Sequence, residues 1–338
     1  MTTTATDAPL LARVDAFLRD EGFNPSTTVV TILTGDASDR RYVRVQPASG
    51  PSLVLMVHVE AIDAQRLPFV QVHTLLTAMG LPVPAVRAAS GPLGILALDD
   101  LGDTTLQHAL DGADGATRLA LYRQAVDVIV ALQHRAPQHA AHATLPFSLA
   151  FDVDKLTWEL AFFTRHFLEE FRGATLSPSV RGALDDEWRQ LASALAAEPR
   201  VLCHRDFHSR NLMWHGGRLH LIDFQDARLG PDTYDLVSLV RDSYVSLTAE
   251  ERASLIDDAA RALGHADLAY FRSRADTMAL QRNLKALGTF GYQATSRGNP
   301  AYAQYVPRTL EYIRETTAAD PRFGRLRALL AESLDELR

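Results

Sequence analysis

The amino-acid sequence predicts an α+β protein with a small β-rich N-terminal lobe and a larger, mainly helical C-terminal lobe. Three observations support this prediction. The 338 residues exceed the usual size of a single hydrophobic core. Short strand-like segments fill the region 28–99, and long amphipathic segments follow it. We place the boundary after residue 101, so that the lobes span 1–101 and 102–338 and are expected to meet at a cleft.

The N-terminal lobe contains short β-rich segments, each bounded by Gly, Pro or Asp. They read TVVTILT, RYVRVQ, SLVLMVHV and ILALD. A helix is expected over 64–79, because apolar residues recur near helical spacing up to Met79. Gly80 and the two prolines of LPVP then end it. The expected order of elements is β, β, β, α, β, β.

The C-terminal lobe is predicted to be helical because its apolar residues follow a period near 3.6. Helices are expected over 118–134, 155–171, 180–197, 249–263, 266–290 and 302–316, with a charged helix at the C-terminus. Two strand candidates, VLCH and RLHLIDF, interrupt the helices, and the polar stretch 205–218 separates them. We expect the functional residues to lie in this interruption of the helices.

Composition excludes several classes of function. Apolar residues make up 47% and charged residues 22% of the chain, as in ordinary soluble proteins. The net charge of -7 and the absence of a long Lys/Arg run argue against a nucleic-acid partner. The apolar runs are too short to span a bilayer, and the first ten residues do not resemble a secretion signal, so we expect no membrane partner and a cytoplasmic protein.

The lone cysteine, Cys203, is expected to be a buried apolar residue. It has no second cysteine with which to form an internal disulfide. A Cys/His nucleophile with His204 is set aside, because neighbours in a strand point to opposite faces.

The segment HRDFHSRN and the strand that follows it contain the clearest candidates for catalytic and metal-binding residues. Asp206 stands five positions before Asn211, and Asp223 follows the strand LHLI. Phosphoryl transfer requires a carboxylate that accepts the proton of the attacking hydroxyl, together with oxygen ligands that hold magnesium against the phosphates. We assign the first role to Asp206 and the second to Asn211 and Asp223. The alternative is that these residues are turn and cap residues.

A zinc hydrolase is a weaker interpretation of the same segment. His204 and His208 are four residues apart, as metal ligands on one helix face are. The zinc protease motif, however, requires Glu directly after the first His, and Arg205 stands there instead.

The chain resembles the aminoglycoside phosphotransferase and choline kinase family, through HRDFHSRN and IDFQDARLGPDTYDL. The likeness extends over most of the chain. It implies a protein kinase-like two-lobe fold with ATP and Mg2+ bound between the lobes. It also implies that the linker residues Asp99, Asp100 and Leu101 present backbone groups to the adenine. Within the family, GDASDRRYVRV, HRDFHSRNLMW, YDLVSLVRDSY and QRNLKALGTF are similar to the anomeric N-acetylmuramate/N-acetylglucosamine kinases of bacterial cell-wall recycling.

The sequence departs from this family on the phosphate-binding side. The expected phosphate loop, TGDASDRR, holds a single glycine. Candidate nucleotide contacts are Gly35, Ala37, Ser38, Arg41 and Met56. The family's phosphate-binding lysine falls at Met56, and the following helix lacks the glutamate that would pair with it, offering instead Phe69, Val72 and His73. Both members of the ion pair are therefore missing together.

The missing ion pair leaves two interpretations, an inactive pseudokinase and an active kinase that neutralises phosphate by another route. We favour the active kinase, because the proton acceptor and both metal ligands remain in register.

The resemblance to the anomeric kinases implies a small-molecule amino sugar as the acceptor. A hemiacetal hydroxyl is more acidic than an ordinary alcohol, so Asp206 needs little base strength. The lactyl carboxylate of N-acetylmuramate calls for a cation, whereas a cationic aminoglycoside calls for acids. Candidate sugar contacts are Arg241, Arg282, Lys285, His208 and Asp226. Two alternatives remain: a kinase for an aminoglycoside or a choline-like amine, and a non-catalytic nucleotide-binding module.

Overall fold

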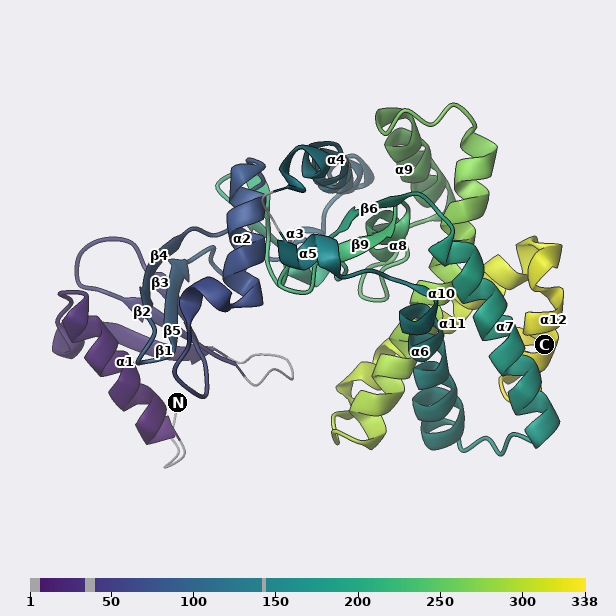
Figure 1. Ribbon diagram of the computed structural model, residues 1–338, viewed down its shortest axis with the longest axis horizontal. Coiled ribbons are helices and arrows are strands. Elements are labelled where there is room, and N and C mark those ends of the chain that lie inside the picture. The colour runs from purple at the N-terminus through teal and green to yellow at the C-terminus, as the bar shows by residue number, and fades with distance from the viewer. Residues whose placement is uncertain (1–6, 34–39, 142–143) are drawn as a thin grey trace. The chain divides into compact units, whose positions relative to one another are not determined.

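The computed structural model describes residues 7–33, 40–141 and 144–338 of the chain. These residues form two compact units, one of Met1–Thr104 with Met213–Gln225, and one of Thr105–Leu212 with Asp226–Arg338. The first is built on a small antiparallel sheet and the second is mainly helical (Figure 1). This confirms the predicted α+β class. The boundary that we placed after residue 101 stays a prediction.

The first unit contains a five-stranded antiparallel sheet in the order β1-β2-β3-β5-β4. Its strands are β1 (Val29–Leu33), β2 (Arg41–Gln46), β3 (Leu53–Val57), β4 (Val86–Ser90) and β5 (Ile95–Asp99). Helix α2 (Pro68–Ala78) lies between β3 and β4 in the chain, so the predicted order β, β, β, α, β, β is confirmed.

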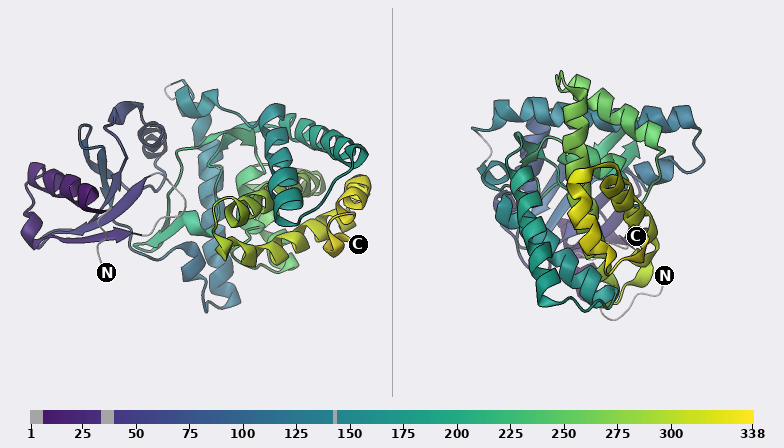
Figure 2. Two further views of the ribbon diagram at one scale, coloured as in Figure 1. Left: turned by 90° about the horizontal axis from the view of Figure 1, so that it is seen from below. Right: turned by 90° about the vertical axis from the view of Figure 1, so that its right-hand side faces the viewer.

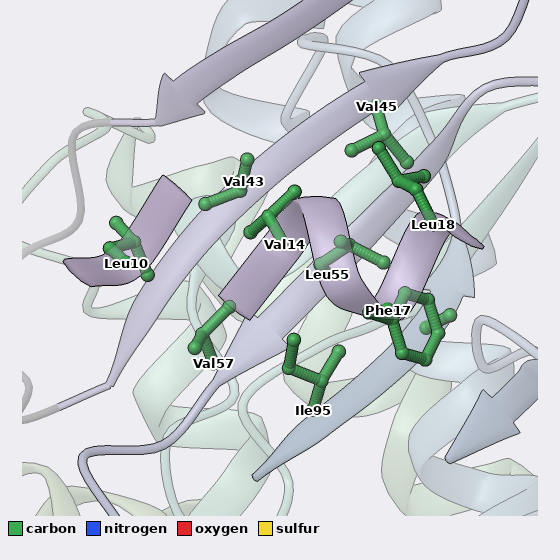
Figure 3. Packing of buried hydrophobic residues seen from close by; sticks show 10 residues of the cluster. Leu10, Val14, Phe17, Leu18, Val43, Val45, Leu55, Val57 and Ile95 are labelled. Atoms are coloured by element: carbon green, nitrogen blue, oxygen red, sulfur yellow. The ribbon is translucent and has the colours of Figure 1, made fainter. Parts of the chain in front are cut away.

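Helix α1 (Ala8–Asp20) precedes the sheet, and the sequence analysis did not anticipate it. Its buried residues recur at helical spacing and pack on one face of the sheet, where alternate residues of the strands form the other half of the core (Figure 3). The core comprises Leu10, Val14, Phe17 and Leu18 from α1 with Val43, Val45, Leu55, Val57, Ile95 and Ala97 from the sheet. The opposite face of the sheet carries Met56.

A hairpin from the middle of the chain belongs to the first unit. Its strands β7 (Leu212–His215) and β8 (Arg218–Leu221) are joined by Gly216 and Gly217, both with positive φ, as a tight two-residue turn requires. The Leu221 N–H donates to the Pro82 carbonyl, and this bond joins the hairpin to the rest of the unit.

The second unit is a helical assembly around the long helix α10 (Leu268–Thr295), shown from two further sides in Figure 2. The other α-helices are α3 (Leu106–Ala109), α4 (Gly115–His139), α5 (Thr144–Ser148), α6 (Val153–Phe163), α7 (Pro178–Ala196), α8 (Tyr234–Val240), α9 (Ala249–Ala262), α11 (Val306–Ala319) and α12 (Gly324–Ala331). Strands β6 (Arg200–Cys203) and β9 (Arg228–Pro231) pair antiparallel among them. Short 3₁₀ helices are η2 (Pro25–Thr27), η3 (Ala64–Arg66), η5 (Ser209–Asn211), η6 (Pro300–Tyr305), η7 (Pro321–Phe323) and η8 (Asp335–Leu337).

Helix α6 continues as a π-helical segment, η4 (Thr164–Phe171), which packs against α10. The two backbones approach closely at two glycines of α10. A Cβ at Gly288 would lie 2.9 Å from the Phe163 Cα, and one at Gly291 would overlap the His166 carbonyl. These glycines seat α10, which carries QRNLKALGTF, against α6 and η4. No helix in the described part of the chain is long and apolar enough to cross a membrane.

Candidate active site

The loop that follows β6 is held by two buried aspartates from outside the motif. Asp235 on α8 accepts hydrogen bonds from the backbone N–H groups of His204 (2.6 Å) and Arg205 (2.9 Å). Asp242, after α8, accepts from Ser209 N–H (2.9 Å). Arg205 lies in the left-handed region with φ 86°, a conformation that a non-glycine residue keeps only when its surroundings fix it. The loop is therefore fixed at both ends.

Asp206 faces cations from distant parts of the second unit. Its carboxylate lies 3.3 Å from Lys285 Nζ on α10, and both side chains are partly buried. Burial by itself raises the pKa of Asp206, but Lys285, Arg205 and Arg282 outweigh it and hold the pKa well below its usual range. Asp206 is therefore an ionised carboxylate with a fixed orientation, as a proton acceptor requires.

Asn211 is oriented by the same loop. Its side-chain nitrogen donates to the Asp206 backbone carbonyl over 2.9 Å, and the same nitrogen lies 3.4 Å from His208 Nε2. The amide nitrogen therefore faces the loop, and the amide oxygen points away from it. That is the atom a hard cation would use.

A pocket of about 130 Å³ opens in front of Asp206, and all of its lining belongs to the second unit. Three lining residues carry buried polar atoms without a hydrogen-bond partner in the described part of the chain: His208 Nδ1, Arg282 Nε and Asn283 Oδ1. Buried polar atoms are normally paired, so these three atoms are available to hydrogen-bond a polar ligand in the pocket. Burial lowers the pKa of His208, and its ring is therefore neutral near pH 7.

The other predicted sugar contacts occupy different positions. Arg241 lines the pocket, but its guanidinium lies 2.8 Å from Glu315 and 3.7 Å from Asp276. Arg282 lines the pocket and donates to the Tyr234 hydroxyl over 2.8 Å.

Asp226 pairs instead with Arg205 of the HRDFHSRN segment. Its carboxylate lies 3.1 Å from Arg205 Nη1, and it does not line the pocket in front of Asp206.

Asp223 lies in the first unit, directly after β8. Its φ of 62° is left-handed, so this aspartate, like Arg205, is held in a conformation that favours glycine. Its carboxylate accepts from Gln225 Nε2 over 2.8 Å and lies 3.9 Å from Arg40. The side chain is 46% exposed.

The predicted magnesium ligands have suitable donor chemistry. Asn211 offers an amide oxygen and Asp223 a carboxylate, the hard oxygen donors that Mg2+ takes. Within the ranges 7–33, 40–141 and 144–338, no group of three or more His, Cys, Asp or Glu side chains is placed to hold a metal. Two protein ligands completed by phosphate and water oxygens are the usual arrangement for magnesium in phosphoryl transfer.

Met56 occupies a closed position on β3. It is 1% exposed and pairs across the sheet with Tyr42 and Leu96. On α2, Phe69 and Val72 are buried, and Phe69 stacks on Phe224 at a ring separation of 4.8 Å. His73, in the middle of the helix, is partly buried and donates from Nε2 to the Pro84 carbonyl over 2.9 Å. The candidate positions of the family's ion pair are thus occupied by packed or hydrogen-bonded side chains.

Because the Met56 site is closed, Met56→Lys is expected to destabilise the protein. A buried ammonium costs several kcal/mol or loses its proton, so we expect the free energy of unfolding to fall by about 2–5 kcal/mol. Urea unfolding measures this loss, with Met56→Leu as the volume-matched control. Unchanged stability together with raised kinase activity would mean instead that the position still accepts a phosphate-binding lysine.

The side chains of the predicted hinge residues already have partners within the protein or are buried. The Asp99 carboxylate accepts from Arg87, and the Asp100 carboxylate pairs with Arg44. Leu101 is buried, and its carbonyl accepts a hydrogen bond from the ring of His215 over 3.2 Å. An adenine contact at this linker would therefore use backbone groups, as the sequence analysis expects.

The rest of the expected phosphate-binding side is only partly described. Gly35, Ala37 and Ser38 lie outside the described residues. Arg41 begins β2 and pairs with Asp7 over 2.9 Å. Alternation along β2 places it on the face that α1 covers, opposite to the face of Met56.

Sequence reasoning missed three residues of the second unit. Asp235 and Asp242 hold the loop from more than 25 positions away in the chain, and only their occurrence in YDLVSLVRDSY gave a signal. Asn283 lies between the two predicted cations of α10, within QRNLKALGTF. The family resemblance drew attention to these two segments. The burial and the hydrogen-bond partners seen in the structure then identified the three residues within them.

The chain is similar to known kinases over most of its length. The chain is 33% identical to an N-acetylmuramate/N-acetylglucosamine kinase of Pseudomonas putida, over 90% of this chain and 88% of that protein. It is 32% identical to a kinase of the same name from Neisseria meningitidis, over 90% of each.

Among solved structures, a choline/ethanolamine kinase family protein from Mesorhizobium loti shares the fold with a TM-score of 0.61. It is 18% identical and covers 94% of this chain and 97% of its own. The predicted protein kinase-like fold is thereby confirmed. Residues 29–275 match the model of the phosphotransferase enzyme family. The chain belongs to the phosphotransferase enzyme family.

Proposed function

We propose that this protein is an ATP-dependent kinase that phosphorylates the anomeric hydroxyl of N-acetylmuramate or N-acetylglucosamine. The observation that carries the proposal is the pocket in front of Asp206, which joins an ionised carboxylate to unpartnered polar atoms for a hydroxyl-rich ligand. Relatives about one-third identical over most of their length carry the name of this kinase. The pocket lining holds three cationic side chains and two carboxylates, which favours a neutral or anionic sugar over a cationic aminoglycoside or choline-like amine.

The side chains at and near Asp206 have distinct roles in the proposed reaction. The sugar hydroxyl forms a bond to the terminal phosphorus, its proton passes to the Asp206 carboxylate, and the bond to the leaving nucleotide breaks. Lys285 lies beside Asp206 and would stabilise the negative charge that develops on the transferred group. A magnesium ion held by Asn211 and Asp223 would supply further neutralisation of phosphate charge.

The sugar contacts follow from the unpaired atoms of the pocket. His208, with a neutral ring, would accept from or donate to a sugar hydroxyl through Nδ1. Arg282 Nε–H supplies a donor and Asn283 Oδ1 an acceptor.

The nucleotide contacts are proposed from the family likeness. They comprise the backbone at Gly35, Ala37 and Ser38, and the linker backbone from Asp99 to Leu101. We propose a cytoplasmic location, where ATP is supplied, and a role in recycling peptidoglycan sugars.

A substrate panel tests the proposal. The protein is incubated with ATP and Mg2+ and, in turn, N-acetylmuramate, N-acetylglucosamine, an aminoglycoside and choline. ADP release and loss of the reducing end are followed. We expect turnover and reducing-end loss with the two amino sugars alone. ADP release without reducing-end loss would contradict anomeric transfer, and nucleotide binding without any turnover would support the non-catalytic module.

Replacement of Lys285 tests its part in the reaction. Lys285→Met is expected to lower kcat about 10- to 100-fold, because it removes one preorganised cation from beside the reacting groups. Steady-state kinetics at saturating ATP measures the effect, and urea unfolding checks that the variant is folded. A change confined to KM would assign Lys285 to sugar binding instead of charge stabilisation.

A further inference from the structure

A second pocket, of about 440 Å³, adjoins the one in front of Asp206. The two pockets share Ser243 and Tyr244 in their linings, so Tyr244 stands between them. The second pocket is lined by Gln107, Ser243, Tyr244, Gln304, Tyr305, Pro307 and Arg308, all from the second unit. No lining residue is an aspartate or glutamate, and one is an arginine. The pocket is therefore suited to an anionic group.

The cations near the first pocket are already paired with protein groups. Arg241 lies beside Glu315 and Asp276, and Lys285 lies beside Asp206. Neither of these two offers an uncompensated charge to a ligand, and Arg282, which donates to the Tyr234 hydroxyl, lies in the first pocket, where it is proposed to hold the sugar.

Arg308 differs from these cations. It is partly buried on α11, and its guanidinium donates from Nη1 to the Ser243 carbonyl over 3.1 Å. No ion pair joins it to a carboxylate in the described part of the chain. A partly buried guanidinium that lacks a carboxylate has its charge available for a ligand.

The wall beside Arg308 is rigid. The Arg210 guanidinium lies 3.9 Å from the centre of the Tyr244 ring and donates to the Tyr305 hydroxyl over 2.5 Å and to Gln107 over 2.9 Å. The Tyr244 and Tyr305 rings meet edge to face at 4.8 Å. Arg210 belongs to the HRDFHSRN loop, so this stack ties the second pocket to the loop that carries Asp206. Arg210 holds the aromatic side chains of the wall but is not among the residues that line the pocket, which leaves Arg308 as the recognition group.

We propose that Arg308 binds the lactyl carboxylate of N-acetylmuramate in this second pocket and so determines how well that sugar is used relative to N-acetylglucosamine. The inference rests on the proposed function, because it takes the sugar to be bound with its reacting hydroxyl at Asp206. The lactyl ether is the group by which the two sugars differ. A cation that touches only this group therefore affects one substrate and spares the other.

The test compares kcat/KM for the two sugars in Arg308→Gln. Glutamine can keep the hydrogen bond to the Ser243 carbonyl while it removes the charge. We expect kcat/KM for N-acetylmuramate to fall about 10- to 100-fold, as for a lost charge-assisted hydrogen bond, and kcat/KM for N-acetylglucosamine to stay within about twofold. Arg308→Lys, which keeps the charge but not the planar fork, is expected to lie between wild type and Arg308→Gln.

Arg314→Gln is the matched control. Arg314 lies on the same helix, is 53% exposed and pairs with Glu311, so neither sugar should be affected. An equal loss for both sugars in Arg308→Gln would assign Arg308 a structural role and overturn the inference. Unchanged values for both would overturn it as well.

Equilibrium binding separates this inference from the proposed function. If the wild type turns over neither sugar, calorimetry with N-acetylmuramate replaces kinetics. Binding by the wild type that Arg308→Gln loses would uphold the inference while the proposed function fails. Absence of binding by the wild type would overturn both.

Discussion

The Asp206→Asn variant is expected to lose most of its kinase activity, with kcat falling about 100- to 10,000-fold. Asparagine has nearly the shape of aspartate but cannot accept the proton of the attacking hydroxyl. The substitution also removes the carboxylate that lies 3.3 Å from Lys285, so three cations around the loop lose their common anion. The rate of ADP release at saturating sugar and ATP measures kcat. Calorimetry with ATP should give a Kd close to that of the wild type.

Loss of folding must be separated from loss of the proton acceptor. Removing one member of a buried charge pair can cost about 3–5 kcal/mol, so kcat should be measured at a temperature where Asp206→Asn is shown by circular dichroism to be folded. Asp258→Asn on α9, whose carboxylate pairs with Arg123 at the surface, is the control and should keep wild-type kcat. A folded Asp206→Asn variant with kcat within threefold of wild type would remove Asp206 from its assigned role.

The candidate proton acceptor and metal ligands were predictable because their signal is local. Asp206 and Asn211 lie within one segment of eight residues, and Asp223 follows the next strand candidate. Such a pattern depends on spacing along the chain, which the sequence gives directly. The surroundings of Asp206 are not local: Lys285 comes from 79 residues further on, and Asp235 reaches the loop from 30 residues beyond Arg205. Such contacts depend on packing of the helices, which periodicity does not specify.

The backbone around the site was also beyond prediction. Arg205 and Asp223 have positive φ although neither is glycine, and their residue types do not predict this conformation. Their conformations are imposed by contacts elsewhere, such as the carboxylate of Asp235 on the Arg205 N–H. The π-helical turns of η4 similarly arise from packing on α10, since its sequence suits an ordinary helix.

Helix α1 was missed for a different reason. Leu10, Val14 and Phe17 recur at spacings of four and three, which is an adequate helical signal. The helix precedes the β-rich region and contains none of the motif residues. The assignment of elements began with the strands at residue 28, so this helix was left out.

Asp235→Ala is expected to show that the loop geometry depends on this one carboxylate. The buried N–H of His204 and the partly buried N–H of Arg205 lose their acceptor, at about 1–3 kcal/mol each, so we expect the free energy of unfolding to fall by about 2–6 kcal/mol. Arg205 would also relax from its left-handed conformation and shift Asp206. A displacement of about 1 Å at the reacting groups costs about 100-fold in kcat, which is the expected loss.

The decisive comparison is between Asp235→Ala and Asp235→Asn, both assayed where they are folded. Asparagine keeps one acceptor oxygen for a backbone N–H but turns an amide N–H toward the other, so its stability and kcat should lie between those of wild type and Asp235→Ala. If kcat reflects loop geometry, the two variants lose activity in the same order in which they lose stability, with ATP affinity unchanged. A folded Asp235→Ala variant with wild-type kcat would mean that Asp242 and the cations around Asp206 hold the loop without Asp235.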